Sequence, residues 1–362
     1  MVEVITFQQV LDKAKLEKGH LRLLLGNGFS ISLFPNIFSY SSLFEQALSK
    51  QLFEKVSKAI PDLFKVLDTF DFEHIMQLLA HATVVLPHYK DDPSVIKSIN
   101  DDIEKLKQIL VEAITSNHPN SPNEITESQY VACKKFLSHF ESVYTVNYDL
   151  LLYWVVLKYL DELGFTDGFH DPMTGVDPSD YYEKDYVSRS PGESSSFKLH
   201  HLHGALHLYD AKYENRKYCW ARTGVKLKDQ ILSALNNGLF PLFISEGDSK
   251  SKLTKINHNT YLASSFKSIG NIGGALVVYG MGFKENDEHI MNAIVNSDIT
   301  HIYLSVYGDI ASTGNKHLIA NVEKMKLKRD ELNKNKKKNS SKKLLNAYYY
   351  DAVSANVWGN SK

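Results

Sequence analysis

The stretch Leu21–Ser30, LRLLLGNGFS, decides how the fold is interpreted. Its apolar run stops at Gly26-Asn27-Gly28, which is typical of a buried strand that ends in a tight turn before a helix. Such a turn lets a ligand approach the backbone, and free N–H groups at the helix start favour anions. The stretch lacks the third glycine of the common dinucleotide fingerprint and the Lys-Ser/Thr pair of a P-loop. An ordinary strand-to-helix turn that needs two glycines therefore stays an alternative.

The composition of the 362 residues is that of a globular protein, with 43% hydrophobic and 23% charged residues. The formal net charge of −1 gives no general attraction for nucleic acid or for an anionic membrane. Two cysteines, Cys133 and Cys219, form neither a disulfide framework nor a structural zinc site by themselves. We find no secretory leader and no apolar span of about 18 residues. These features predict a soluble, cytoplasmic protein.

Apolar strands alternate with helices along the chain. This pattern predicts one α/β, Rossmann-like domain over residues 1–362, with a mostly parallel sheet and helices on both faces. A leading helix is expected over residues 4–17. The first strand begins near Leu21, and later strands are expected within 142–149, 197–210, 217–221, 241–247, 273–280, 301–308 and 344–353.

Three segments interrupt this alternation. Residues 41–116 carry apolar side chains at helical spacing and predict a helical insert after the first strand. Residues 166–196 are rich in Asp, Ser, Pro, Gly and Tyr and predict a long loop or lid. The tract Lys324–Lys343 holds ten basic residues against two acidic ones, which indicates either a solvated helix end or a contact with nucleic acid or a partner.

Polar side chains gather at three predicted strand ends, in GNGFS at 26–30, TVNYD at 145–149 and HLHG at 201–204. In a doubly wound sheet, ligands bind outside the carboxyl ends of the strands, near the point where the strand order reverses. We therefore expect these three segments to lie around one binding site.

In this order, the three segments resemble the Gly-x-Gly-x-Ser, Thr-x-Asn-x-Asp and Leu-His-Gly motifs of the sirtuin superfamily. Residues 277–290, VVYGMGFKENDEHI, are similar to a later strand and glycine loop in the sirtuin-like branch found in bacterial anti-phage defence proteins. The resemblance implies a Rossmann-like NAD pocket and NAD as the substrate. It explains neither the helical insert nor the lid.

The chain also departs from the protein deacylases of that superfamily. Two cysteines cannot build their four-cysteine zinc ribbon, and Leu33-Phe34-Pro35-Asn36 replaces their Pro-Asp-Phe-Arg segment. Asn27 stands where the family has alanine. These departures argue against deacylation of proteins and favour NAD consumption.

The resemblance implies two catalytic residues, Asn147 and His203. Cleavage of the nicotinamide–ribose bond needs a water placed on one face of the ribose, and Asn147 can position it. His203, with an ordinary pKa near 6.5, can accept a proton from that water or from a ribose hydroxyl. The turn is expected to hold the pyrophosphate through backbone N–H groups, with Ser30 capping the helix behind it. The predicted NAD-binding residues are Gly26, Asn27, Gly28, Phe29, Ser30, Asp149, Gly280 and Asp287.

Other roles stay open for several of these residues. Asn147 and Asp149 can form an Asx turn that caps the helix at residue 150, and Asp287 can simply begin a helix. The run of His200, His201, His203 and His207 suggests a metal, but zinc needs a carboxylate or a further histidine from elsewhere in the chain. We expect no metal.

These observations predict an NAD glycohydrolase that depletes NAD as an anti-phage effector, as a homo-oligomer or with a partner defence protein. One alternative is a non-catalytic module that binds NAD or ADP-ribose and signals to a partner. Another is a nuclease of the abortive-infection type, because a similar Gly-Asn-Gly-Phe-Asp turn opens that family. No membrane contact is expected, and any contact with nucleic acid is expected to be limited to the basic tract Lys324–Lys343.

Overall fold

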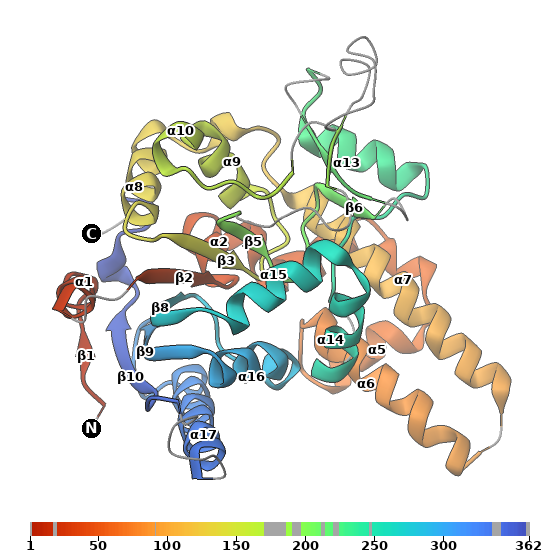
Figure 1. Cartoon of the computed structure of the whole chain (residues 1–362). Coiled ribbons are helices and arrows are strands. Elements are labelled where there is room, and N and C mark those ends of the chain that lie inside the picture. Colours follow the sequence, from red (N-terminus) through yellow and green to blue (C-terminus); the bar gives the residue numbers. More distant parts are fainter. Residues whose placement is uncertain are drawn as a thin grey trace.

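The computed structural model describes residues 2–16, 20–90, 92–169, 186–189, 197–210, 214–219, 224–245, 248–334 and 342–359. Within these ranges seven strands form one parallel sheet in the order β1-β10-β9-β8-β2-β3-β5 (Figure 1). This confirms the predicted α/β, Rossmann-like class. The strands are β1 (Val4–Ile5), β2 (Leu21–Leu25), β3 (Ser142–Thr145), β5 (Leu199–His201), β8 (Gly273–Tyr279), β9 (Asp298–Val306) and β10 (Asn346–Asp351).

Alternate residues of the central strands enter two separate cores, because successive side chains of a strand point to opposite faces. Leu23 and Leu25 pack with helices α1 (Phe7–Leu16), α8 (Glu127–Leu137) and α9 (Leu151–Lys158). Leu24 packs with α15 (Thr260–Gly270), α16 (Glu288–Asn296) and α17 (Thr313–Lys334) on the other face. The sheet is thus buried on both sides, which explains why β2 reads as a continuous apolar run.

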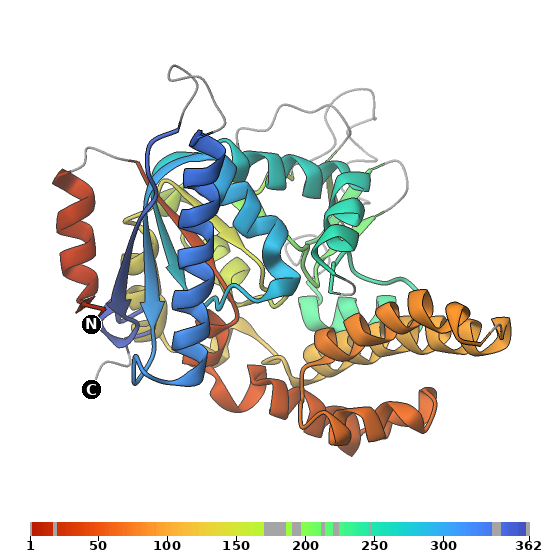
Figure 2. The same cartoon turned by 90° about the horizontal axis from the view of Figure 1, so that it is seen from below.

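The helical insert lies between β2 and β3 and extends away from the sheet (Figure 2). Aromatic side chains form its core, where the Phe44 and Phe64 ring centroids lie 4.9 Å apart. Asp71 caps α6 by accepting the backbone N–H groups of Glu73 and His74. The described elements between β2 and α8 are α2 (Gly28–Leu33), α3 (Pro35–Phe38), α4 (Tyr40–Ser49), η1 (Leu52–Lys55), α5 (Ala59–Val66), α6 (Phe72–Val85), η2 (Leu86–His88), α7 (Pro93–Asn117) and η3 (Pro122–Glu124).

Two predictions near the sheet edges need correction. Residues 4–17 are not all helical, since Val4–Ile5 pairs with β10 before α1 begins. The loop predicted over 166–196 contains a strand, β4 (Tyr186–Arg189), while residues 170–185 and 190–196 lie outside the described part of the chain. β4 joins β6 (Leu208–Asp210) and β7 (Asn215–Tyr218) in a separate antiparallel sheet.

The apolar run at 241–247 is predicted to be a strand, but within its described residues, 241–245, the structure has a single isolated bridge, between Phe243 and Gly204. Its backbone pairs irregularly with the loop after β5: the Ile244 N–H donates to the His203 carbonyl at 2.8 Å, and the Ala205 N–H to the Leu242 carbonyl at 3.0 Å. The remaining elements are α10 (Leu160–Leu163), α13 (Leu227–Asn236), α14 (Ser249–His258), η4 (Glu285–Asp287) and η6 (Val353–Ala355).

The basic tract begins inside α17, and residues 335–341 lie outside the described ranges. Arg329 is 1% exposed, and its guanidinium donates to the carbonyls of Ile294, Val295 and Ile299. Arg329 therefore connects α17 to α16 and β9 through hydrogen bonds, and its guanidinium is not available to bind the phosphates of a nucleic acid.

Among the described helices, we find none that is both long enough and apolar enough to cross a membrane.

Candidate functional site

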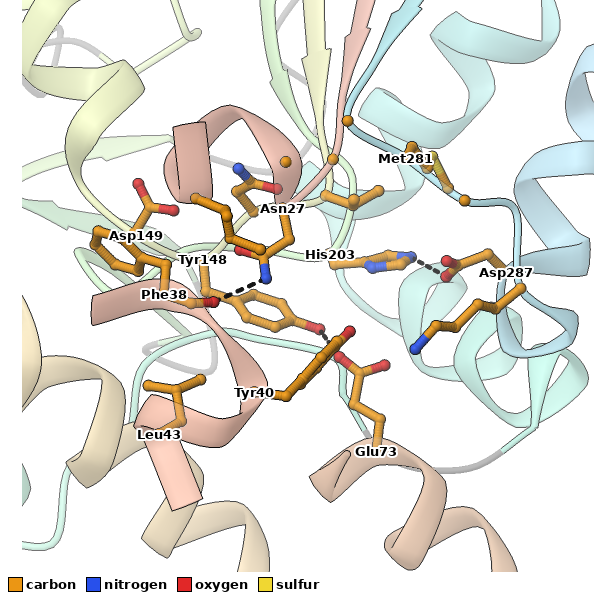
Figure 3. Close-up of a pocket in the computed structure, with 18 of the residues that line it drawn as sticks. Asn27, Phe38, Tyr40, Leu43, Glu73, Tyr148, Asp149, His203, Met281 and Asp287 are labelled. Carbon is orange, nitrogen blue, oxygen red and sulfur yellow. Dashed lines mark hydrogen bonds and ion pairs between the residues drawn. The ribbon is translucent and has the colours of Figure 1, made fainter. Parts of the chain in front are cut away.

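A cavity of about 350 Å³ lies at the carboxyl ends of the central strands (Figure 3). The chain runs outward from β2 through β3 to β5 and then returns to the other side of β2 with β8, so the strand order reverses between β2 and β8. Loops that diverge at such a point open a ligand crevice. The helical insert contributes Tyr40 and Glu73 to the wall, and the cavity volume is at the lower end of the range for small-molecule pockets.

Most of the predicted site residues meet at this cavity, although they come from distant parts of the chain. Phe29 and Ser30 do not line it. Phe29 is fully buried in the core, where its ring lies 4.8 Å from the Trp358 ring and its carbonyl accepts the indole N–H. The predicted residues that line the cavity are Gly26, Asn27, Gly28, Asn147, Asp149, His203, Gly280 and Asp287.

The glycine turn packs directly against the loop after β8. The N–H groups of Gly26 and Gly28 donate to the carbonyls of Tyr279 and Gly280, each at 2.9 Å. A Cβ on Gly28 would lie 2.5 Å from the Gly280 Cα. Gly280 has φ +70°, a conformation that glycine adopts without strain. The glycines are thus required for contact between two loops, as in the alternative of an ordinary turn.

This packing changes the expected role of the turn. The N–H groups of Phe29 and Ser30 are also taken, because they donate to the carbonyls of Gly26 and Asn27. The row of free amides that we expected to hold a pyrophosphate is therefore not present at Gly26, Gly28, Phe29 and Ser30. Helix α2, which starts at Gly28, has only six residues. The turn contributes shape to the cavity and not a set of free amide donors.

Ser30 links the first strand end to the second and does not cap α2. Its hydroxyl donates to Asp149 Oδ2 at 2.5 Å and accepts from Asn147 Nδ2 at 3.0 Å. Asp149 Oδ1 accepts the Leu151 N–H at 2.9 Å, which is the Asx turn considered from the sequence. Burial raises the pKa of Asp149, and the Ser30 hydroxyl opposes this shift. Both carboxylate oxygens of Asp149 therefore already accept hydrogen bonds from groups of the protein.

Two amide oxygens on the cavity wall have no hydrogen-bond partner among the described residues. Asn147 Oδ1 and Asn286 Oδ1 are both buried and unpaired, while the Nδ2 groups of the same side chains donate to Ser30 and Glu73. A buried polar atom without a partner costs about 1–3 kcal/mol, so such atoms point to a missing water or ligand. Both oxygens are acceptors, which suits a ligand rich in N–H or O–H groups.

A charged network forms the wall opposite the glycine turn. Lys252, from α14, has a side chain with no exposed surface, and its ammonium lies 2.7 Å from Glu73 Oε2 and 3.9 Å from Asp287 Oδ1. Glu73 also accepts from Asn286 Nδ2 at 3.0 Å and from the Tyr148 hydroxyl at 3.2 Å. Burial by itself lowers the pKa of Lys252, but Glu73 and Asp287 more than offset it and raise this pKa.

His203 lies beside this network and meets a second histidine. Its Nε2 is 2.9 Å from His289 Nε2 and 4.0 Å from Asp287 Oδ1. Burial lowers the pKa of His203 well below 6.5, and it lowers the pKa of His289 to about 3, with Lys252 adding to both shifts. Burial raises the pKa of Asp287 to about 6, with Lys252 opposing this shift. Both imidazoles are thus neutral at pH 7.

The other histidines of the same segment lie apart from this group. His200 stacks on Tyr144, with ring centroids 4.5 Å apart, and His207 stacks on Tyr153 at 4.3 Å. The rings of His201 and His207 meet edge to face at 5.4 Å. Of the four histidines considered from the sequence, only His203 lines the cavity.

Sequence reasoning missed Lys252, Glu73 and His289. His289 had a weak signal, because an acidic residue two positions before a histidine, as in Asp287-Glu288-His289, can place both side chains at one helix start. Glu73 follows the capping residue of α6, and only the fold brings it to the cavity. Lys252 lies in a polar segment that looks exposed in the sequence but is covered by the insert and by η4.

The sheet and its cavity define a Rossmann-like α/β protein with a cavity at the reversal of strand order. The chain belongs to the DUF4917 family, a domain of unknown function, whose sequence model matches residues 23–358. The matched span includes the insert, the cavity and the charged network. No curated protein matches the chain.

Proposed function

We propose that the protein is an NAD glycohydrolase, which converts NAD and water to nicotinamide and ADP-ribose in the cavity at the ends of β2, β3, β5 and β8. The observation that carries this proposal is that Asn147 and His203, 56 positions apart in the sequence, line one cavity. Within the described part of the chain, Asn147 Oδ1 has no hydrogen-bond partner there. The resemblance to sirtuin-like domains supplies the reaction.

The reaction requires few groups. The water oxygen attacks the anomeric carbon of the ribose, the bond to the nicotinamide nitrogen breaks, and the electron pair leaves with nicotinamide. Asn147 Oδ1 accepts a hydrogen bond from the water and orients it. The neutral imidazole of His203 takes the proton, and Asp287, at 4.0 Å, stabilises the imidazolium that forms.

A second cavity supports a dinucleotide as the substrate. It has a volume of about 650 Å³ and includes Ser305 and Trp358, which the first cavity lacks. The two cavities share Gly28, Ile31, Gly280, Met281 and Gly282. NAD can extend across the shared glycine loops, with the nicotinamide ribose beside Asn147 and the adenosine in the second cavity. Small residues at the crossing let the backbone approach the pyrophosphate closely.

The same resemblance supports a role in defence against phage, through depletion of NAD. Such an enzyme needs restraint until infection, so we propose that a homo-oligomer or a partner defence protein controls it. In the described part of the basic tract, Arg329 is buried, Lys326 pairs with Glu323, and Lys342 pairs with Asp298.

The test is consumption of NAD by the purified full chain, with nicotinamide and ADP-ribose separated by chromatography. Asn147→Ala and His203→Ala are each expected to lower kcat/KM at least about 100-fold, the range lost with a positioned acid or base. Exposed His317 on α17 offers the matched control, and His317→Ala is expected to keep the wild-type rate. Circular dichroism establishes that each variant is folded.

Two results would overturn the proposal. One is wild-type protein that leaves NAD intact while calorimetry detects NAD or ADP-ribose binding, which identifies a binding module. The other is hydrolysis that persists in both cavity variants. A parallel incubation with RNA tests the nuclease alternative, for which RNA and not NAD is cleaved.

A further inference from the structure

We propose that His203, Asp287 and His289 bind one divalent transition-metal ion, and that zinc is the metal which their donor set fits best. Two imidazole nitrogens and one carboxylate oxygen form one of the ligand sets of zinc sites that keep one position open. The inference goes beyond the proposed NAD hydrolysis and does not depend on it.

The ligand atoms already lie close together. One donor atom from each of the three residues falls within 4.8 Å of the others, with His203 Nε2 2.9 Å from His289 Nε2 and 4.0 Å from Asp287 Oδ1. Bonds of about 2.0–2.1 Å in a tetrahedron put ligand atoms about 3.3 Å apart. The two observed distances lie on either side of this value, so small side-chain rotations suffice.

The fold holds each ligand in place. Asp287 and His289 flank the junction of η4 with α16, and His203 precedes Gly204, whose Cβ position would be 1.9 Å from the Leu242 carbonyl oxygen. This close approach fixes the loop after β5. Ser249 Oγ lies 3.2 Å from His289 Nδ1 and so orients the ring with Nε2 toward His203. Metal-bound histidines commonly have such a partner on the second nitrogen.

The local charge balance leaves one carboxylate for a cation. Lys252 pairs with Glu73 at 2.7 Å, and Lys284 pairs with Asp71 at 2.6 Å. Asp287 has only the longer contact of 3.9 Å to Lys252. The Lys252 ammonium is the main charge that opposes a metal, and Glu73 compensates it.

An open coordination position would face the cavity. His203 and Asp287 line the cavity, whereas His289 lies behind them against Phe266, with ring centroids 5.8 Å apart. A metal held there would present its remaining position to a water or a ligand oxygen. His203 Nε2 cannot bind a metal and accept a proton at the same time, so the metal-bound state and the proposed base exclude each other at this atom.

The experiment uses untagged full-length protein that has been treated with a chelator and dialysed. Titration with Co²⁺ is followed by visible absorption, and titration with Zn²⁺ by calorimetry. We expect one ion per chain and the intense visible bands of four-coordinate cobalt. His289→Ala and Asp287→Asn should each weaken binding by at least about 100-fold, because loss of a mere supporting contact already costs about 10–100-fold.

Two further variants keep the test decisive. Ser249→Ala changes no ligand and should weaken binding about 10–100-fold, which gives a second probe if a ligand variant does not fold. The exposed His317 again provides the control, since His317→Ala should bind as the wild type does. The proposal is overturned if the wild type takes up no ion, or if a folded His289→Ala or Asp287→Asn variant binds as tightly as the wild type. NAD hydrolysis enters none of these measurements.

Discussion

Two walls of the cavity are built in different ways. The glycine wall, formed by Gly26–Ser30 and Gly280–Gly282, consists of backbone, and its amides at Gly26, Gly28, Phe29, Ser30 and Gly280 donate within the protein. The charged wall consists of side chains from four separate segments: Glu73, His203 and Asp287 line the cavity, and Lys252 and His289 lie behind them. Most amides of the glycine wall thus have partners within the protein, whereas the charged wall holds ionic groups with little exposure to water.

This difference shows why the most conspicuous part of the sequence is not the part that carries the titratable side chains of the cavity. Glycines are required where backbones touch, as at Gly28 and Gly280, and that requirement leaves a clear mark on the sequence. Chemistry instead requires side chains that converge only after folding. The glycine wall therefore shapes the cavity, and the charged wall brings its titratable side chains together.

The largest effect is expected from Gly280→Ala. Its Cβ would lie 2.5 Å from the Gly28 Cα, and its φ of +70° is unfavourable for any side chain. Overpacking costs about 1–3 kcal/mol and a left-handed conformation a similar amount, so the free energy of unfolding should fall by about 4 kcal/mol. Urea unfolding followed by circular dichroism measures this loss.

Gly282→Ala is the matched control for the glycine wall. A Cβ there meets nothing within 4 Å, so its free energy of unfolding should stay within about 0.5 kcal/mol of the wild type. If Gly280→Ala and Gly282→Ala are equally stable, contact between the two backbones does not require glycine at position 280. Close approach of a ligand would then explain the glycines better.

The sequence predicted the central strands because they are apolar on both faces. Leu21–Leu25 and Gly273–Tyr279 lie in the middle of the sheet and need no other signal. It did not predict β1, since two residues gain their strand character only from β10, more than 300 positions away. The apolar run at 241–247 was wrongly predicted to be a strand, because apolar residues alone do not show which partner a backbone pairs with. Its described backbone pairs with the loop after β5 and not with the seven-stranded sheet.

The candidate site divides in the same way. Asn147 and His203 were found because each follows a strand, and the carboxyl ends of parallel strands share one edge. Their partners were not found. Glu73 and Lys252 lie 179 positions apart, and no local pattern reveals that an insert and a later helix enclose them. The expectation of no metal rested on the lack of an evident extra ligand, and the fold places Asp287 and His289 at that position.

An intermediate effect is expected from Lys252→Met in the charged wall. In the wild type the buried Lys252 ammonium lies 2.7 Å from Glu73. The change keeps an unbranched side chain at position 252 but removes this ammonium, so the Glu73 carboxylate loses its partner. Removing one member of a buried ion pair costs about 3 kcal/mol, because the other charge stays desolvated. Urea unfolding at pH 7.5 should show this loss.

The double variant Lys252→Met with Glu73→Gln separates charge from packing. It removes both charges, so most of the lost stability should return, to within about 1 kcal/mol of the wild type. If the double variant is no more stable than Lys252→Met, the unpaired charge of Glu73 is not the cause of the lost stability. The charged wall would then be stabilised by packing, as the glycine wall is.

The smallest effect concerns His118, a titratable support of the β3 end. His118 Nε2 accepts the Leu150 N–H at 3.0 Å, directly after Asp149, while Nδ1 pairs with the Pro119 carbonyl at 3.0 Å. Only the neutral ring can accept at Nε2. Burial lowers the pKa of His118 from 6.5 to about 4, so on acidification the unfolded chain takes up a proton first. The stability that His118 contributes is therefore complete above pH 6.5 and is lost as the pH falls toward 4.

At pH 5 this loss should amount to about 2 kcal/mol, from the linkage between proton uptake and unfolding. His118→Gln cannot titrate, so the fall in its free energy of unfolding between pH 7.5 and pH 5 should be smaller than that of the wild type by this amount. Exposed His88 gives the control, because His88→Gln should retain the wild-type fall. Urea unfolding at both pH values measures the difference. If the free energy of unfolding of His118→Gln falls by as much as that of the wild type, His118 is protonated in the folded state at pH 5. The β3 end would then hold a charged group, as the charged wall does.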